Sequence, residues 1–199
     1  IAPTKKASFE ETYLETSQVI TNAIKERKKP LYLLYTSSTS VYGDQEGKIT
    51  DERALRKPAS ENAKILCEAE DRYLSASSKY NDVCVLRLGG IYGPNRTLDS
   101  RALKMSKKEF PGNGNEFTNN IHLNDITKAI EYCLSKKITG TFNLVNNAHP
   151  PRKDLYDYLC DQLEVSPPIW KDSTEGSNAF VSNSNIKDEG FILQNNQLF

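Results

Sequence analysis

Two largely apolar runs place the tightest limit on how this chain can fold. Residues 31–35 read LYLLY, and residues 82–88 read DVCVLRL. A strand that faces water on one side alternates polar and apolar residues, and neither run does so. Continuous apolar runs of this length are typical of strands buried on both faces of a parallel sheet.

The segments around these runs carry apolar side chains at helical spacing. Residues 8–28 show the pattern before the first run, and residues 61–79 show it between the two runs. Alternation of helix and strand is the pattern of parallel βαβ units, so we predict an α/β fold with a doubly wound parallel sheet. Further elements are expected as helices over 98–108, 125–136 and 151–164 and as a strand over 141–145.

Composition narrows the class of protein. The 199 residues can bury one full core, and the balance of 26 basic and 26 acidic side chains argues against nucleic acid or a membrane surface as a partner. The four cysteines form no C-x-x-C pair, the two histidines are far apart, and no apolar run reaches the about 20 residues that span a bilayer. We therefore expect no metal and a soluble protein of a reducing compartment, which is the cytoplasm or the stroma or matrix of an organelle.

Five hydroxyl side chains follow the first apolar run. In YTSSTSVYG, residues 35–43, they extend from Thr36 to Ser40. The carboxyl end of a strand is where open α/β sheets bind their ligands, but Ser and Thr also cap strand ends and turns. The segment is therefore either a polar strand cap or half of an active site.

Four segments together resemble a known enzyme family. They are YTSSTSVYGD (35–44), PASENAKILCE (58–68), LRLGGIYGPNR (86–96) and NNIHLNDITKAI (119–130). In this order they are similar to the extended short-chain dehydrogenase/reductases, and most to the NAD-dependent epimerase/dehydratase group in its atypical, sugar-epimerase-like branch. The resemblance implies a Rossmann-like domain, an NAD or NADP cofactor, and oxidoreductase or isomerase chemistry.

The resemblance also implies catalytic residues. Ser38 matches the Ser or Thr that holds the substrate by a hydrogen bond. Lys64 matches the lysine of a Tyr-x-x-x-Lys pair, in which the lysine lowers the pKa of the tyrosine; its alternative is a solvated helix residue. Ser60 occupies the tyrosine position, where a serine cannot serve as the acid/base because its proton is held too tightly. After Pro58, Ser60 also fits a helix N-cap.

Further contacts follow from the same resemblance. In related enzymes an arginine grips the diphosphate of a sugar nucleotide, and Asn120 stands at its position in this branch. Arg96 is then the best remaining anion binder, with an ordinary surface residue as its alternative. The implied cofactor contacts are Thr36, Ser37, Lys64, Gly89, Gly90 and Ile91. The implied substrate contacts are Ser38, Ser40, Tyr42, Arg96 and Asn120.

The sequence contains neither G-x-G-x-x-G nor G-x-x-G-x-x-G. Such a turn cradles the cofactor pyrophosphate in the first βαβ unit. We therefore expect residues 1–95 to be the C-terminal half of the dinucleotide-binding domain. Residues 96–199 are expected to carry a substrate lobe together with a returning helix and strand of the sheet at about 125–145. The missing half is expected from another chain, from a self-dimer or from an upstream segment.

Two functions stay open from the sequence. The first is an NAD(P)-dependent, epimerase/dehydratase-like oxidoreductase that acts on a nucleotide-sugar or a small hydroxyl/carbonyl substrate, and Ser38 with Lys64 favours it. The second is a non-catalytic NAD(P)-binding or scaffold protein with a degenerate active site, and Ser60 favours it.

Overall fold

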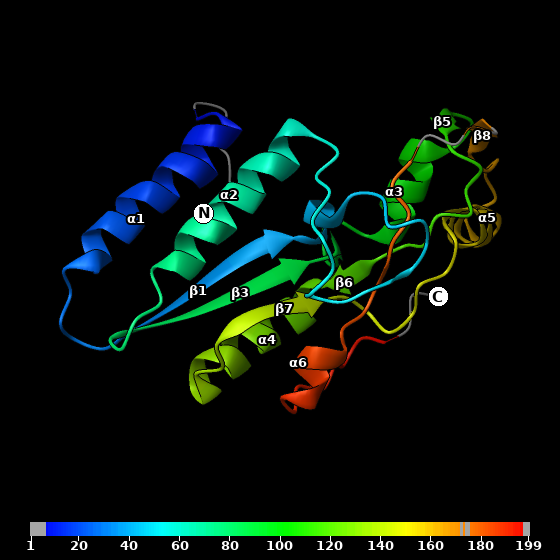
Figure 1. Ribbon diagram of the computed structural model, residues 1–199. Coiled ribbons are helices and arrows are strands. Elements are labelled where there is room, and N and C mark those ends of the chain that lie inside the picture. Colours follow the sequence, from blue (N-terminus) through cyan, green and yellow to red (C-terminus); the bar gives the residue numbers. More distant parts are fainter. Residues whose placement is uncertain (1–6, 172, 174–175, 197–199) are drawn as a thin grey trace.

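A three-stranded parallel sheet forms the centre of the computed structural model, which describes residues 7–171, 173 and 176–196 (Figure 1). β1 (Leu31–Ser38) pairs with β3 (Asn81–Leu88) along its full length, and β3 pairs with β7 (Gly140–Leu144). The order β1–β3–β7 confirms the predicted α/β class, and the two apolar runs of the sequence supply the first two strands.

Alternate side chains of β3 explain why helices cover both faces of the sheet. Val83 and Val85 pack with Tyr73 on one face, where α1 (Thr16–Lys25) and α2 (Glu61–Ser75) lie. Cys84 and Leu86 pack on the other face, which α4 (Leu123–Lys136) covers (Figure 1). A strand with helices on both faces has no solvent side, which accounts for the continuous apolar residues 83–86 of β3.

Short elements complete the chain around this sheet. Three further strand pairs are parallel: β2 with β9, β4 with β6, and β5 with β8. α3 and α5 pack against each other in a second apolar cluster. The remaining bounds are η1 (Glu11–Glu15), η2 (Thr39–Tyr42), β2 (Ile49–Thr50), β4 (Gly90–Tyr92), α3 (Leu98–Met105), β5 (Glu109–Pro111), β6 (Asn120–His122), α5 (Arg152–Gln162), β8 (Ile169–Lys171), β9 (Phe180–Val181) and α6 (Ser184–Asp188).

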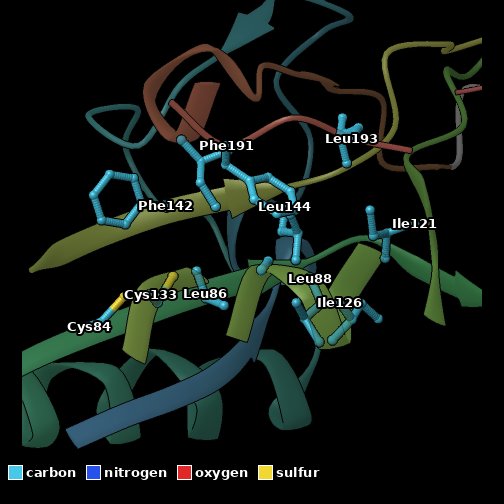
Figure 2. Packing of buried hydrophobic residues seen from close by; sticks show 12 residues of the cluster. Cys84, Leu86, Leu88, Ile121, Ile126, Cys133, Phe142, Leu144, Phe191 and Leu193 are labelled. Carbon is cyan, nitrogen blue, oxygen red and sulfur yellow. The ribbon is translucent and has the colours of Figure 1, made fainter. Parts of the chain in front are cut away.

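The C-terminal segment contributes to the main core. Figure 2 shows Phe191 and Leu193 packed beside Leu144 of β7, and Ile186 of α6 is buried in the same cluster. The Asn- and Ser-rich tail therefore carries a few apolar anchors that fasten it along the sheet, next to the edge where β1 and β3 end.

β1 departs from the expected burial. The sequence predicts a strand buried on both faces, but every residue of β1 except Ser37 is partly exposed. β3, with a similar apolar run, is almost wholly buried. The difference arises because β3 has a neighbour on each side, whereas β1 pairs with β3 alone in the described part of the chain.

Candidate functional site

A cavity of about 650 Å³ opens where β1 and β3 end. Ser38 is the last residue of β1 and lies beside Leu88, the last residue of β3; Gly89 and Gly90 follow directly. Parallel strands end at the same edge of a sheet, which brings these sequence-distant segments together. The cavity is lined by Ser38, Thr39, Ser40, Gly43, Ala59, Ser60, Gly89, Gly90, Ile91, Arg96, Asn119, Ser177, Ala179 and Val181.

The hydroxyl cluster divides between structural and cavity-facing roles. The Ser38 hydroxyl accepts a hydrogen bond from the Ser40 backbone N–H (3.2 Å) and so caps η2. The same side chain lines the cavity, as do Thr39 and Ser40. The two alternatives for this segment are thus compatible, because a hydroxyl that accepts one bond still has its own proton to donate.

Thr36 and Ser37, the expected cofactor contacts on β1, lie away from this cavity. Thr36 lines a separate hollow of about 130 Å³ between β1 and the first helices. Ser37 is buried, and its hydroxyl has no hydrogen-bond partner among the described residues. Side chains alternate across a strand, so Ser37 points to the opposite face from Ser38.

Ser60 and Lys64 each have a local partner on α2. The Ser60 hydroxyl accepts from the Ala63 N–H (3.2 Å) and caps α2, and the residue also lines the cavity. The Lys64 ammonium donates to the Glu61 carboxylate (3.2 Å), and its side chain is 57% exposed. Lys64 is absent from the described lining of the cavity, so the described site holds no acid/base pair of the Tyr–Lys type.

Gly89 and Gly90 bring two strand ends into close contact. The Gly90 N–H donates to the Asn119 carbonyl (2.6 Å). A Cβ at Gly89 would lie 2.5 Å from that same carbonyl oxygen, so a larger residue would push β4 and β6 apart. Both glycines line the cavity together with Ile91.

Asn119 was not identified from the sequence and forms a fixed part of the wall. Its Nδ2 donates to the Ala179 carbonyl (2.8 Å), and its Oδ1 accepts from the Val181 N–H (3.0 Å). The Nδ1 atom of His149 lies 3.0 Å from the same Oδ1. Burial lowers the pKa of His149, which favours the neutral ring at this contact.

Asn120 and Arg96 occupy different environments. Asn120 is 4% exposed, and its Oδ1 accepts from Nη1 of Arg101 (3.2 Å). Arg101 also donates from Nη2 to the Ile91 carbonyl (2.9 Å). Arg96 is exposed and lines the cavity. Arg101 was not identified from the sequence, because an arginine within a helix gives no signal that distinguishes it from a surface residue.

Tyr42, an expected substrate contact, lies in the core instead. It is fully buried, accepts from Nη1 of Arg87 (2.8 Å) and donates to Oδ1 of Asn143 (2.7 Å). Burial raises the pKa of this phenol, although the Arg87 guanidinium opposes the shift. The side chain anchors the end of η2, and with it the Ser38–Ser40 wall, to β3 and β7.

The described residues form no metal site, no disulfide and no membrane-spanning helix. No three His, Cys, Asp or Glu side chains among the described residues are placed to hold a metal ion. All four cysteines are free thiols. None of the described helices is long and apolar enough to cross a membrane.

The amino-acid sequence is similar to that of a known family and of a curated relative. The family model described as "NAD dependent epimerase/dehydratase family" matches residues 3–148. Protein YeeZ of Escherichia coli (strain K12) is 31% identical over 188 residues, covering 93% of this chain and 66% of YeeZ. The chain thus spans about two thirds of the length of this curated relative.

Solved structures share the fold. A functionally unknown conserved protein from Silicibacter pomeroyi matches 100% of this chain and 72% of its own, with a TM-score of 0.77 and 22% identity. The dTDP-glucose 4,6-dehydratase from Bacillus anthracis in complex with NAD matches 92% of this chain and 62% of its own, with a TM-score of 0.77 and 19% identity. The UDP-N-acetylglucosamine 4-epimerase from Methanobrevibacter ruminantium matches 93% and 64%, with a TM-score of 0.77 and 18% identity.

Proposed function

The chain belongs to the NAD dependent epimerase/dehydratase family, and on that premise we propose that its cavity is the substrate end of an NAD(P)-dependent oxidoreductase site. The proposed substrate is a nucleotide-sugar or a small compound with a hydroxyl or carbonyl group. One observation carries the proposal: Ser38 lies on the cavity wall at the carboxyl end of β1. A hydroxyl in this position can hold a substrate oxygen by a hydrogen bond.

The residues present fit one end of a nicotinamide dinucleotide. Gly89, Gly90 and Ile91 give the cavity a small, apolar wall beside its hydroxyls, and about 650 Å³ lies within the usual range for small-molecule sites. When bound, this cofactor supplies hydride transfer. The solved Bacillus anthracis dehydratase holds NAD, which supports the same cofactor here. The pyrophosphate cradle has no counterpart in this sequence.

The runner-up is a protein that binds the same ligands without turnover. It is favoured by Ser60, which caps α2 at the position where related enzymes carry a tyrosine. It is also favoured by Lys64, which pairs with Glu61 and is exposed. In that case Ser38 orients the ligand, and no acid/base side chain of the described site transfers a proton.

We expect the 199-residue chain alone to bind NADH with a dissociation constant no tighter than about 1 mM, or about −4 kcal/mol. The reason is that its sequence lacks the glycine-rich turn whose backbone N–H groups hold the pyrophosphate. Isothermal titration of the chain, alone and together with the missing half of the dinucleotide-binding domain, measures this directly. Micromolar binding by the chain alone would show that the cofactor needs no such turn.

With both halves of the dinucleotide-binding domain present, Ser60→Tyr is expected to produce or increase epimerase or dehydratase turnover. A general acid/base contributes about 100- to 10,000-fold, so the gain is measurable if the rest of the site is intact. Ser60→Ala is the matched control, because it removes the α2 cap, at a cost of about 1 kcal/mol, without adding a phenol. Product is followed by chromatographic separation of the product sugar from the substrate, because the reaction leaves no net change in NADH. Wild-type turnover near the typical ~10 s⁻¹ that Lys64→Ala leaves unchanged would contradict the assignment of Ser60 and Lys64.

A further inference from the structure

A second hollow lies behind one wall of the sheet-edge cavity. Residues 176–179 form a wall of both spaces, because their residues alternate between the two sides. Ser177 and Ala179 line the cavity, whereas Gly176 and Asn178 line the hollow, which measures about 280 Å³. The hollow is therefore a separate space, with its own set of side chains.

The charge of this hollow is acidic. Asp44, Glu46 and Glu116 line it, and no lysine or arginine of the described residues does so. Two of the three carboxylates have partners. Oδ1 of Asp44 accepts from the backbone N–H groups of Glu46 and Asn178 (both 3.0 Å), and Oε2 of Glu46 lies 2.6 Å from Nζ of Lys48. Glu116 is left as the carboxylate to explain.

Glu116 is buried without a partner. The residue is 8% exposed, and its Oε2 has no hydrogen-bond partner among the described residues. No described lysine, arginine or histidine lies within 4.0 Å of either carboxylate oxygen. A Cβ at Gly176 would lie 3.1 Å from its Oε1, so the glycine leaves this oxygen open on the hollow side. Burial of a carboxylate is unfavourable unless a donor or a cation pairs with it, and a cation in the hollow supplies that partner.

The chemistry of the hollow favours an amine over a metal ion. No three His, Cys, Asp or Glu side chains of the described residues are placed to hold a metal, and Asp44 already uses one oxygen for backbone contacts. A volume of about 280 Å³ is close to the lower end of the range for small-molecule sites, and a bare ion would leave most of it empty. An ammonium group offers three N–H donors and accepts none, which suits a wall of carboxylate and amide oxygens.

We infer that this hollow binds a small organic amine whose ammonium group pairs with Glu116. Asp44 and Glu46 then attract a second positive charge at the other end of the ligand, so a diamine is expected to bind more tightly than a monoamine. The hollow is distinct from the sheet-edge cavity, and the inference therefore does not depend on the proposed function.

The test measures binding of putrescine, a linear diamine, and of butanediol, its neutral analogue, by isothermal titration with both halves of the dinucleotide-binding domain present. Putrescine is expected to bind and butanediol is not. Glu116→Gln is expected to weaken putrescine binding about 10- to 100-fold, the effect of losing one charge-assisted contact. Asp44→Asn, at an exposed carboxylate, is expected to weaken it at most about fivefold. Glu68→Gln is the matched control and should leave the affinity unchanged, because it removes an exposed carboxylate of α2 that does not line the hollow.

Thermal melting separates a lost contact from a lost fold. Without ligand, Glu116→Gln is expected to melt at or above the temperature of the wild type, because it removes an unpaired buried charge; putrescine should raise the melting temperature of the wild type but not of this variant. A Glu116→Gln variant that melts well below the wild type would show that the carboxylate has a partner in the free protein, and would overturn the inference. Equal binding of butanediol, unchanged putrescine affinity in Glu116→Gln or an equal loss in Glu68→Gln would each do the same. Calcium binding that Glu116→Gln abolishes, with no putrescine binding, would make the hollow a metal site instead.

Discussion

Glu70→Ala is expected to lower the free energy of unfolding by about 3–5 kcal/mol, the usual cost of breaking a buried ion pair from one side. Glu70 of α2 is 0% exposed, and its Oε2 lies 2.7 Å from Nη2 of Arg87 on β3, whose side chain is 5% exposed. The substitution leaves the guanidinium buried without its carboxylate. Arg87 also donates to Tyr42, which anchors the Ser38–Ser40 wall, so the substitution is expected to loosen that wall as well.

Asp71→Ala is the matched control for this prediction. Asp71 neighbours Glu70 on the same helix, and its exposed carboxylate pairs with Arg56 at 2.8 Å. An exposed pair contributes about 0–1 kcal/mol, so urea unfolding should separate the two variants clearly. The double variant Glu70→Met with Arg87→Met should recover most of the loss, because no unpaired charge stays buried. If Glu70→Ala and Asp71→Ala lower the free energy of unfolding equally, the buried Glu70–Arg87 pair does not stabilise the fold.

The main sheet was predictable because its strands carry a strong local signal. The apolar run of residues 82–88 corresponds to β3 (Asn81–Leu88), and the run at 31–35 begins β1 (Leu31–Ser38). Burial between two helical layers requires such runs. The predicted helix over 61–79 ends earlier in the structure, since α2 ends at Ser75, and helix ends are set by caps rather than by periodicity.

The C-terminal wall of the site was not predictable in the same way. The segment AFVS (179–182) predicts a short strand, and β9 (Phe180–Val181) forms there, but two residues are too few to show any period or to indicate a place in the site. Ile186, Phe191 and Leu193 enter the core one at a time from a polar sequence. Their burial depends on the surface that the sheet and α4 present, which is a tertiary property and leaves no local pattern.

The site shows the same division between local and tertiary information. The N-cap role of Ser60 follows from Pro58 and the helical pattern after it, and the structure shows that cap. The partners of Tyr42 do not follow from sequence, because Arg87 and Asn143 are 45 and 101 residues away along the chain. A tyrosine next to a ligand loop could face the loop or the core. Tyr42 faces the core because the buried Arg87 guanidinium donates to its hydroxyl there.

The free edge of β1 leads to the second large prediction. β1 pairs with β3 alone in the described part of the chain, and its apolar residues are partly exposed. Leu33 and Tyr35 line a hollow of about 130 Å³ beside it, and the Tyr35 hydroxyl is buried without a partner among the described residues. We propose that a further strand pairs with this edge, supplied by the half of the dinucleotide-binding domain that holds the glycine-rich turn.

The 199-residue chain by itself is therefore expected to associate or to unfold without a sharp transition. An apolar edge of roughly 200–300 Å² left in water costs several kcal/mol at about 25 cal/mol per Å², which is comparable with the whole stability of a domain, about 5–15 kcal/mol. Light scattering after size exclusion, thermal melting and binding of an apolar dye measure this. Leu33→Lys should shift the chain toward monomer, because a charge on an edge strand opposes pairing; Leu103→Lys, on the exposed surface of α3, should not. A wild-type monomer that melts sharply and binds no dye would show that the edge of β1 needs no partner.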